Sequence, residues 1–402
     1  MRWGAVVPLV GGQLLGTEMA IGTPPAEMAS FSAFEYNDGF ARRRWPDAPF
    51  RLIDRGERMA GRFMAVVSVC PCAGLSMLST AKSNSDARDR MNQWMFQSAE
   101  YVMGDVRPDV YMGENAPNMF SNMGRPTVAR LVDIARRNGY TVTFYKTNAV
   151  THGLPQRRIR TFYYFWREQP PPAEVPWFDR AAPSALEYLS SMGRPDGWDA
   201  KTTYDLKELS LYRFLRSRYG DAWRNGGEDP PQRYSNGFTI LTKKQLLHEY
   251  IERSAPDHDH FRRAMLRYRE KMAGDGGGVF IFPPVFDMGG YPAVMKKTAE
   301  MLVHPTEDRY LNVREVGWLM GLPGDFEMPP RDRFNVLCQN VPVQSARDAT
   351  SVALEHLGGR LKRSTDDVMW FDNESKRAYR TIDKLPLTSH QTELSAGDEV
   401  FA

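Results

Sequence analysis

The chain has 402 residues, of which 42% are hydrophobic and 25% charged, a composition that excludes collagen-like, coiled-coil and largely disordered proteins. It carries 52 Lys and Arg residues against 49 Asp and Glu residues, a net charge of +3, so no global field indicates a nucleic-acid partner. Such a site would need local clustering of charge. At this length we expect one large domain of roughly 200 residues or more and a smaller second domain.

Three cysteines, Cys70, Cys72 and Cys338, form too sparse and odd a set for a secreted disulfide framework, so we expect a reducing cytoplasm. The apolar stretch at residues 5–10 is too short to span a membrane, and the chain start lacks the charged flank of a signal peptide. The sequence therefore indicates no membrane partner.

The first 166 residues alternate between strand and helix patterns, which is typical of an α/β domain with a mostly parallel sheet. Amphipathic spacing with flanking glycine and proline predicts helices at residues 14–21, 90–103 and 127–137. Apolar runs predict strands at residues 5–10, 29–34, 63–69, 109–112, 140–145 and 159–166.

Three consecutive prolines at residues 170–172 favour extended geometry and predict a domain boundary. From residue 173 to 300 the alternation disappears, and helical patterns remain only at 206–219, 242–251 and 261–272. The last of these carries a local cluster of positive charge. Beyond residue 300 we expect helices at 311–320 and 346–357 and then a polar tail.

Three polar segments lie where predicted strands end or begin, at the edge of the sheet where α/β proteins bind ligands. Cys72 follows the third strand and can act as a nucleophile, although an isolated cysteine is more often structural. Glu114 follows the fourth strand, as a general acid or as a surface residue that caps a turn. Arg158 and Arg160 lie on one face at the start of the last strand. They could recognise a phosphate or carboxylate, or they could belong to a solvated edge strand.

In this order, the three segments resemble the DNA cytosine-5 methyltransferase family. Cys72 and Glu114 are separated by 42 residues (114 − 72) and Glu114 and Arg158 by 44 (158 − 114), close to the spacing usual in that family. The residues that match its Pro-Cys, Glu-Asn-Val and Gln-x-Arg-x-Arg motifs are Pro71 and Cys72, Glu114 and Asn115, and Gln156, Arg158 and Arg160.

The resemblance implies an α/β, Rossmann-like methyltransferase fold that uses S-adenosylmethionine, with a smaller irregular target recognition domain. The implied divisions are a catalytic and cofactor-binding domain at 1–168, a target recognition domain at 173–300, late motifs at 301–360 that pack back on the catalytic domain, and a tail at 361–402.

The resemblance also implies how S-adenosylmethionine is bound. Glu35 and Tyr36 resemble the acidic and aromatic pair that holds ribose and adenine, and Asp54 would meet the adenine amino group. The implied cofactor-binding residues are Val10, Gly11, Gly12, Glu35, Tyr36, Asp54, Asn340 and Val341. Residues 5–12 lack the acidic residue, the adenine-packing aromatic and one glycine of the family's first motif, and Gln339 replaces its usual glycine. The methionine end of the cofactor is therefore expected to be held differently.

The mechanism implied by the resemblance is covalent catalysis on a cytosine flipped out of double-stranded DNA. Cys72 adds to carbon 6 while Glu114 protonates or hydrogen-bonds nitrogen 3. Arg158 holds the carbonyl oxygen of the base, and Arg160 supports that loop. The residues expected to contact DNA are Ser76, Gln156, Arg262, Arg263 and Arg267.

Two alternatives stay open. An enzyme related to this family would use the same Cys72 and Glu114 with a modified one-carbon donor, as the altered first and last motifs suggest. A catalytically inactive DNA-binding module would keep its affinity for duplex DNA after Cys72→Ala. A metal site at His258 and His260 is not expected, because polar loop histidines are commoner than ligands. We expect a monomer in the cytoplasm of a bacterium or a phage-infected cell.

Overall fold

The structure, a computed structural model, describes residues 1–71, 75, 85–193, 299, 302, 304, 307, 309–328 and 333–381. The chain divides into two units. The first comprises residues 1–154, 158–181 and 320–387, and the second comprises residues 155–157, 182–319 and 388–402. The predicted division into domains at 1–168, 173–300, 301–360 and 361–402 stays a prediction.

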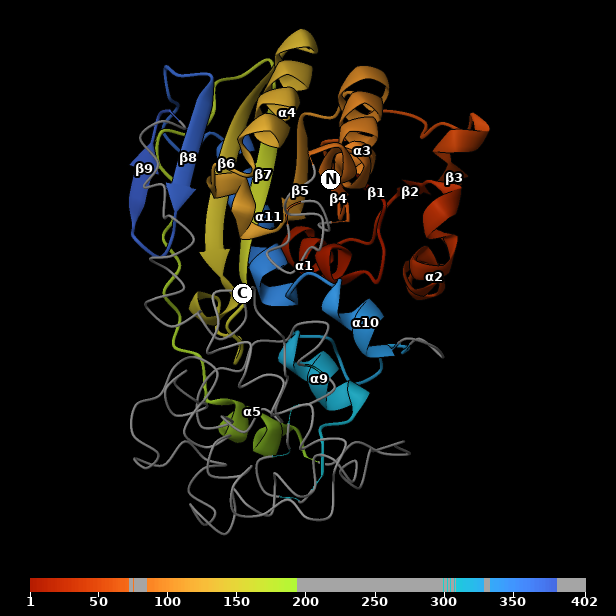
Figure 1. Ribbon diagram of the computed structural model, residues 1–402. Helices are drawn as coiled ribbons and strands as arrows, with labels where there is room; N and C mark the ends of the chain where they lie inside the picture. Colours follow the sequence, from red (N-terminus) through yellow and green to blue (C-terminus); the bar gives the residue numbers. More distant parts are fainter. Residues whose placement is uncertain are drawn as a thin grey trace, which may run out of the picture. The chain divides into compact units, whose positions relative to one another are not determined.

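In the described part of the first unit, a nine-stranded sheet runs in the order β3-β2-β1-β4-β5-β7-β6-β8-β9 (Figure 1). The strands are β1 (Trp3–Val6), β2 (Glu27–Ser30), β3 (Phe50–Leu52), β4 (Ala65–Ser68), β5 (Val110–Asn115), β6 (Tyr140–Asn148), β7 (Ile159–Arg167), β8 (Val368–Asp372) and β9 (Arg377–Tyr379). The strands from β3 to β5 are parallel, and β7 lies antiparallel between β5 and β6. The predicted α/β class with a mostly parallel sheet is confirmed.

Helices cover both faces of this sheet. The α-helices described in this unit are α1 (Gly12–Ile21), α2 (Glu35–Arg44), α3 (Ser85–Glu100), α4 (Arg125–Arg137), α10 (Arg333–Cys338) and α11 (Val343–Leu357). α3 contacts α4 and α1 contacts α11. Right-handed crossovers from β1 through α1 to β2 and from β4 through α3 to β5 run in opposite directions along the sheet, which places α1 and α3 on opposite faces. Figure 1 shows α3 and α4 in front of the sheet and α11 behind it.

The core of the first unit lies where the central strands are covered on both faces. β4 and β5 are buried along their whole length, which explains the apolar residues at 65–67 and 110–112. In α4 the residues that face the sheet are Val128, Leu131, Ile134 and Ala135, and they are buried. This spacing of three and four residues is the amphipathic pattern that predicted the helix.

In the second unit the described helices are α5 (Ala185–Met192) and α9 (Val313–Leu319), which contact each other. Ser184 and Glu187 form a capping box at the start of α5. Glu315 in α9 is buried and receives two hydrogen bonds of 2.8 Å from the guanidinium of Arg309. Most of the predicted target recognition domain, including its three predicted helices, lies outside the described residues.

The first predicted strand, at residues 5–10, is wrong at its end. β1 ends at Val6, and Val7 and Leu9 adopt left-handed conformations with φ of 52° and 48°. Pro8 between them has no N–H to donate to a neighbouring strand. Residues 7–11 therefore form the loop that leads into α1.

The predicted strand at 29–34 is also too long, because β2 ends at Ser30 and residues Ser32–Phe34 form a short 3₁₀ turn. Helix α2 follows and was not predicted. Phe31 and Phe34, which made the segment look like a strand, instead pack against Trp94 of α3, with ring centroids 5.0 and 5.1 Å apart.

Two further predictions are corrected. Glu114 and Asn115 lie within β5 rather than in a loop after it. Part of the predicted polar tail forms β8 and β9, and β8 pairs in parallel with β6. No helix in the described ranges is long and apolar enough to cross a membrane.

Candidate active site

Glu114 is a buried carboxylate near the carboxyl end of β5. It lies opposite Phe162 of the antiparallel strand β7, and its side chain is almost fully enclosed. Arg160 Nε is 2.7 Å from Glu114 Oε1, but its N–H does not point at that oxygen, so the contact is an ion pair rather than an aligned hydrogen bond. The pair places a carboxyl group and a guanidinium side by side where β5 and β7 end and begin.

Burial raises the pKa of Glu114 above its ordinary value, and the positive charges of Arg160 and Arg158 oppose that rise without cancelling it. A carboxyl group with a raised pKa keeps its proton at a higher pH than a solvated one. This is the property that a general acid needs near neutral pH.

Arg158 is buried and engaged with the backbone of a distant part of the chain. Its Nη2 donates to the carbonyl oxygens of Cys338, at 2.6 Å, and of Asn340, at 3.0 Å. Its own backbone N–H donates to the Asn148 side chain at 3.0 Å. Arg158 therefore ties the entry of β7 to the segment that precedes α11. Its predicted contact with the cytosine carbonyl stays a prediction.

The loop between β1 and α1 meets the late segment at Asn340. Gly12 N donates to Asn340 Oδ1 at 2.8 Å, and a Cβ on Gly12 would collide with the Val341 carbonyl oxygen and the Asn340 side chain. Gly11 adopts a φ of +109°, which favours glycine. Val10 is buried in the same loop. The structure thus brings together the five predicted residues of the methionine end.

Glu35 and Tyr36 lie at the start of α2, beyond the turn that follows β2, and both are exposed. The Tyr36 ring is 49% exposed and contacts the edge of Phe40 at 6.0 Å between centroids. Asp54 follows β3 in the turn Ile53–Arg55, and both its oxygens accept from Ser32 N at 3.1 Å. Although slight burial opposes it, these hydrogen bonds hold the pKa of Asp54 below its ordinary value.

Asp38 is an acidic residue that the sequence analysis missed. It lies on α2, one turn after Glu35, and it is fully buried. Its Oδ1 accepts from Leu9 N at 2.9 Å, while Oδ2 has no hydrogen-bond partner among the described residues. Burial raises the pKa of Asp38 to about 7, although the N–H of Leu9, the nearby Ser30 hydroxyl and the charge of Arg42 oppose this rise. The available signal was that Asp38 lies three residues after Glu35, on the same face of a helix. It was missed because the sequence analysis predicted a strand at 29–34 and no helix after it.

Gln13 is a second residue that the sequence analysis missed. It follows Gly12 in the first turn of α1 and is fully buried, and neither atom of its amide has a hydrogen-bond partner among the described residues. The amide nitrogen of Asn340 is also without a partner there. Buried polar groups of this kind are costly unless a ligand or water satisfies them.

Of the remaining predicted residues, the structure describes only Gln156. Gln156 belongs to the second unit, where its Nε2 donates to the Leu319 carbonyl at 2.5 Å. The residues that lie outside the described part of the chain are Cys72, Ser76, Arg262, Arg263 and Arg267. Cys70 is described and buried, and burial raises the pKa of its thiol to about 11, which fits a structural cysteine. No cluster that could hold a metal ion occurs in the described ranges.

Comparison with protein families identifies the relationship. A model described as C-5 cytosine-specific DNA methylase matches residues 50–349. The chain belongs to this family. Membership confirms the predicted resemblance and makes the protein a cytosine-C5 methyltransferase by family. No curated protein is similar enough in sequence to count as a match.

Solved structures show that the chain has the Rossmann-like fold of the C5 methyltransferases. A putative DNA modification methyltransferase encoded within an E. coli prophage has a TM-score of 0.55 at 15% identity and covers 89% of this chain and 99% of its own. A mutant of Spodoptera frugiperda DNMT2 has a TM-score of 0.51 at 11% identity, covering 88% and 100%. The Entamoeba histolytica methyltransferase EhMeth has a TM-score of 0.50 at 12% identity, covering 89% and 98%.

Proposed function

We propose that this C5 methyltransferase transfers a methyl group from S-adenosylmethionine to carbon 5 of a cytosine in double-stranded DNA. The observation that carries the proposal is the buried Glu114, with a raised pKa and a guanidinium at 2.7 Å, in a chain of the C-5 family. A cytosine ring becomes nucleophilic at carbon 5 only when a nucleophile has added at carbon 6 and the resulting charge is stabilised.

In the proposed mechanism, Cys72 and Glu114 each have one chemical role. The Cys72 thiolate forms a bond to carbon 6, and Glu114 delivers a proton or hydrogen bond to nitrogen 3, which directs electron density to carbon 5. S-adenosylmethionine supplies an electrophilic methyl group on its sulfonium. Loss of the carbon 5 proton to water and departure of Cys72 as thiolate, with return of the nitrogen 3 proton to Glu114, restore the aromatic ring. Because carbon 6 is stacked within a duplex, the base must be flipped out of the helix first.

The residues around the β1–α1 loop fit S-adenosylmethionine, which carries an ammonium, a carboxylate and a ribose diol. Asp38 Oδ2 and Asn340 Nδ2 are a buried acceptor and a buried donor without partners among the described residues. Gly12 has no side chain, and this lets the loop approach Asn340 closely. Asp54 accepts from Ser32 N through both oxygens and retains further acceptor capacity after β3. We propose that these groups, with Asp38 rather than Glu35 as the buried acid, hold the cofactor.

Mass spectrometry of nucleosides from cytosine-containing duplex DNA, incubated with the protein and S-adenosylmethionine, tests the proposal. We expect one added methyl on deoxycytidine, no product from Cys72→Ala, and covalent trapping of the wild type on 5-fluorocytosine DNA. A matched RNA provides the control for substrate class. Duplex binding without product or trapping would overturn the proposal in favour of an inactive DNA-binding module.

A modified one-carbon donor is the second candidate. The buried Gln13 supports it, because its unsatisfied amide would suit a polar substituent on the transferred carbon. Product mass separates the two candidates. The modified donor is supported if the mass added to deoxycytidine exceeds that of a methyl group. This product should form with host metabolite extract but not with S-adenosylmethionine alone. The monomeric state and cytoplasmic location stay predictions.

A further inference from the structure

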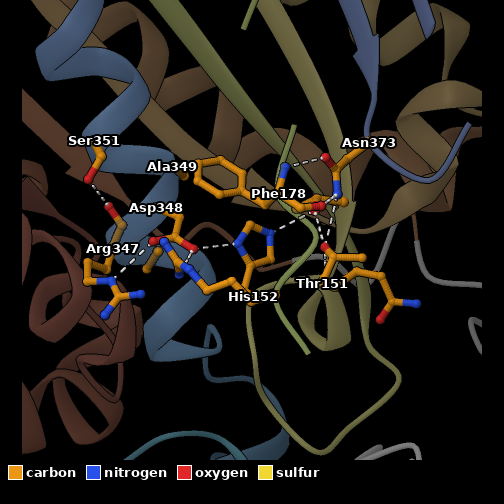
Figure 2. Close-up of polar contacts among 12 residues, drawn as sticks. Thr151, His152, Phe178, Arg347, Asp348, Ala349, Ser351 and Asn373 are labelled. Atoms are coloured by element: carbon orange, nitrogen blue, oxygen red, sulfur yellow. Dashed lines mark hydrogen bonds and ion pairs between the residues drawn. The ribbon is translucent and has the colours of Figure 1, made fainter. Parts of the chain in front are cut away.

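A buried polar cluster lies beside the strands that carry Glu114 and Arg160, and the proposed mechanism does not use it (Figure 2). His152, in the connection between β6 and β7, is fully buried and engaged at both ring nitrogens. Its Nδ1 is 2.8 Å from Asp348 Oδ2, and its Nε2 is 2.7 Å from Thr147 Oγ1. The ring also packs against Phe178, with centroids 5.0 Å apart.

The protonation of this cluster is set by its charges. Asp348, on α11, is buried and paired with Arg180 and, through its other oxygen, with Arg347. Although burial opposes it, the hydrogen bond from His152 and the arginine charges hold the pKa of Asp348 below its ordinary value. Burial lowers the pKa of His152 more than Asp348 raises it. We therefore assign a neutral ring whose Nδ1–H donates to the carboxylate and whose Nε2 accepts from the Thr147 hydroxyl.

The cluster reaches the acid site through the strand register. Thr147 of β6 lies directly opposite Arg160 of β7, and Glu114 of β5 lies opposite Phe162, two residues further along β7. Opposite residues of antiparallel strands share a face, and side chains two residues apart share one as well. Thr147, Arg160 and Glu114 therefore lie in one row on the same face of the sheet.

That face is the one covered by α11. Tyr164, which is two further residues along β7, donates its hydroxyl to the Ala349 carbonyl at 3.0 Å. Helix α11 follows Asn340, whose side chain accepts from Gly12 N, and it packs along α1. The contact between His152 and Asp348 thus joins the strands of the acid site to the helix that continues from the cofactor loop.

We propose that the His152–Asp348 pair is a positioning device that holds Thr147 and its cross-strand neighbour Arg160 in place against α11, so that the Arg160 guanidinium stays on Glu114. This inference rests on the proposed function, since it gives Glu114 its role as the acid. His152 and Asp348 touch no substrate in this scheme. They act through Arg160, by fixing the strand from which it projects.

The test measures the pKa of Glu114 directly in the cofactor-free protein. The carboxyl carbon is followed by ¹³C NMR through a pH titration, with Glu114→Gln used to assign the signal. His152→Phe keeps the packing against Phe178 and removes both hydrogen bonds. Thr147→Val keeps the shape of the side chain and removes one. In both variants we expect the pKa of Glu114 to rise by about one unit, because the opposing charge of Arg160 is less well placed.

Tyr164→Phe is the matched control. It removes one hydrogen bond between the same strand and the same helix, next to Asp348, without altering the cluster. We expect its Glu114 pKa to be unchanged. In single-turnover methyl transfer, the two cluster variants should be about tenfold slower, as expected for misplaced catalytic groups, while their affinity for S-adenosylhomocysteine stays within about threefold of the wild type.

An unchanged Glu114 pKa in both folded cluster variants would overturn the inference, as would an equal shift in Tyr164→Phe. If His152→Phe does not fold, Thr147→Val carries the test alone. If the wild type transfers no methyl group, the proposed function fails, and the titration still decides whether the cluster positions Arg160 on Glu114.

Discussion

Two buried carboxylates, Glu114 and Asp38, lie at different parts of the same sheet edge and differ in what surrounds them. Glu114 meets the guanidinium of Arg160 at 2.7 Å, and that charge and Arg158 oppose the rise of its pKa on burial. Asp38 is held mainly by a backbone N–H, and one of its oxygens has no partner among the described residues. The Glu114 carboxylate is therefore paired within the protein, whereas one oxygen of Asp38 remains available to accept a hydrogen bond.

The largest effect is expected when the acid Glu114 itself is replaced. We expect Glu114→Gln to slow single-turnover methyl transfer by about 10²- to 10⁴-fold, the range typical of general acid catalysis, because an amide cannot give up a proton to nitrogen 3. Rapid-quench assays of product measure the rate. Glu100→Gln, an exposed carboxylate in a surface ion pair, is the control and should leave the rate unchanged. A rate within threefold of the wild type in Glu114→Gln, about 0.7 kcal/mol, would remove the acid role from this residue.

The pKa of Asp38 predicts how stability depends on pH. Because its pKa is raised from 3.8 to about 7, the folded protein retains a proton that the unfolded chain has lost between these values. This contribution to the free energy of unfolding is fully present below pH about 4, falls by up to roughly 1.4 kcal/mol per pH unit as pH rises, and is lost above pH about 7. Asp38→Asn should remove this slope in urea denaturation. Identical slopes in the wild type and the variant would contradict a raised pKa.

Much of the fold could be predicted because the burial of the central strands is visible in the local sequence as runs of apolar residues. β4 and β7 read as apolar runs, and α4 shows an amphipathic pattern. Helix α2 was missed because its buried face consists only of Asp38, Phe40 and Ala41. No local pattern distinguishes a buried aspartate from an exposed one.

The residues of the candidate site could be predicted from sequence motifs, but most of their contacts could not. Glu114 and Arg160 were expected at the same edge of the sheet, and the structure pairs them. The contact of Arg158 with a base stays a prediction, whereas its hydrogen bonds to carbonyl oxygens 180 and 182 residues further along the chain were not predicted. The partner of Asp38, the N–H of Leu9, likewise depends on a loop whose left-handed residues no pattern predicted.

A smaller effect, on stability, is expected when Arg158 near Glu114 is replaced. Arg158→Met leaves the buried carbonyl groups of Cys338 and Asn340 without this donor, so we expect the free energy of unfolding to fall by about 1–3 kcal/mol. Arg157→Met changes the exposed neighbouring arginine and should have little effect. Urea denaturation of both variants measures the difference. Equal midpoints would show that the contact of Arg158 with the segment before α11 contributes nothing to stability.

The finest test compares the two acids of α2 as cofactor ligands. If Asp38 binds the ammonium or ribose of the cofactor, affinity should rise between pH 6 and 8 as its carboxyl group ionises around pH 7. At pH 8, Asp38→Asn should weaken binding of S-adenosylhomocysteine by about tenfold, the loss expected for one charge-assisted hydrogen bond, and should flatten the pH profile. Glu35→Gln, three residues earlier and exposed, should do neither. The ligand has a neutral sulfur, so attraction to a sulfonium cannot account for the effect. The opposite result in calorimetry, with Glu35→Gln weakening binding and Asp38→Asn leaving it intact, would return the acid role to Glu35 and leave Asp38 as a support for the strained loop at Leu9.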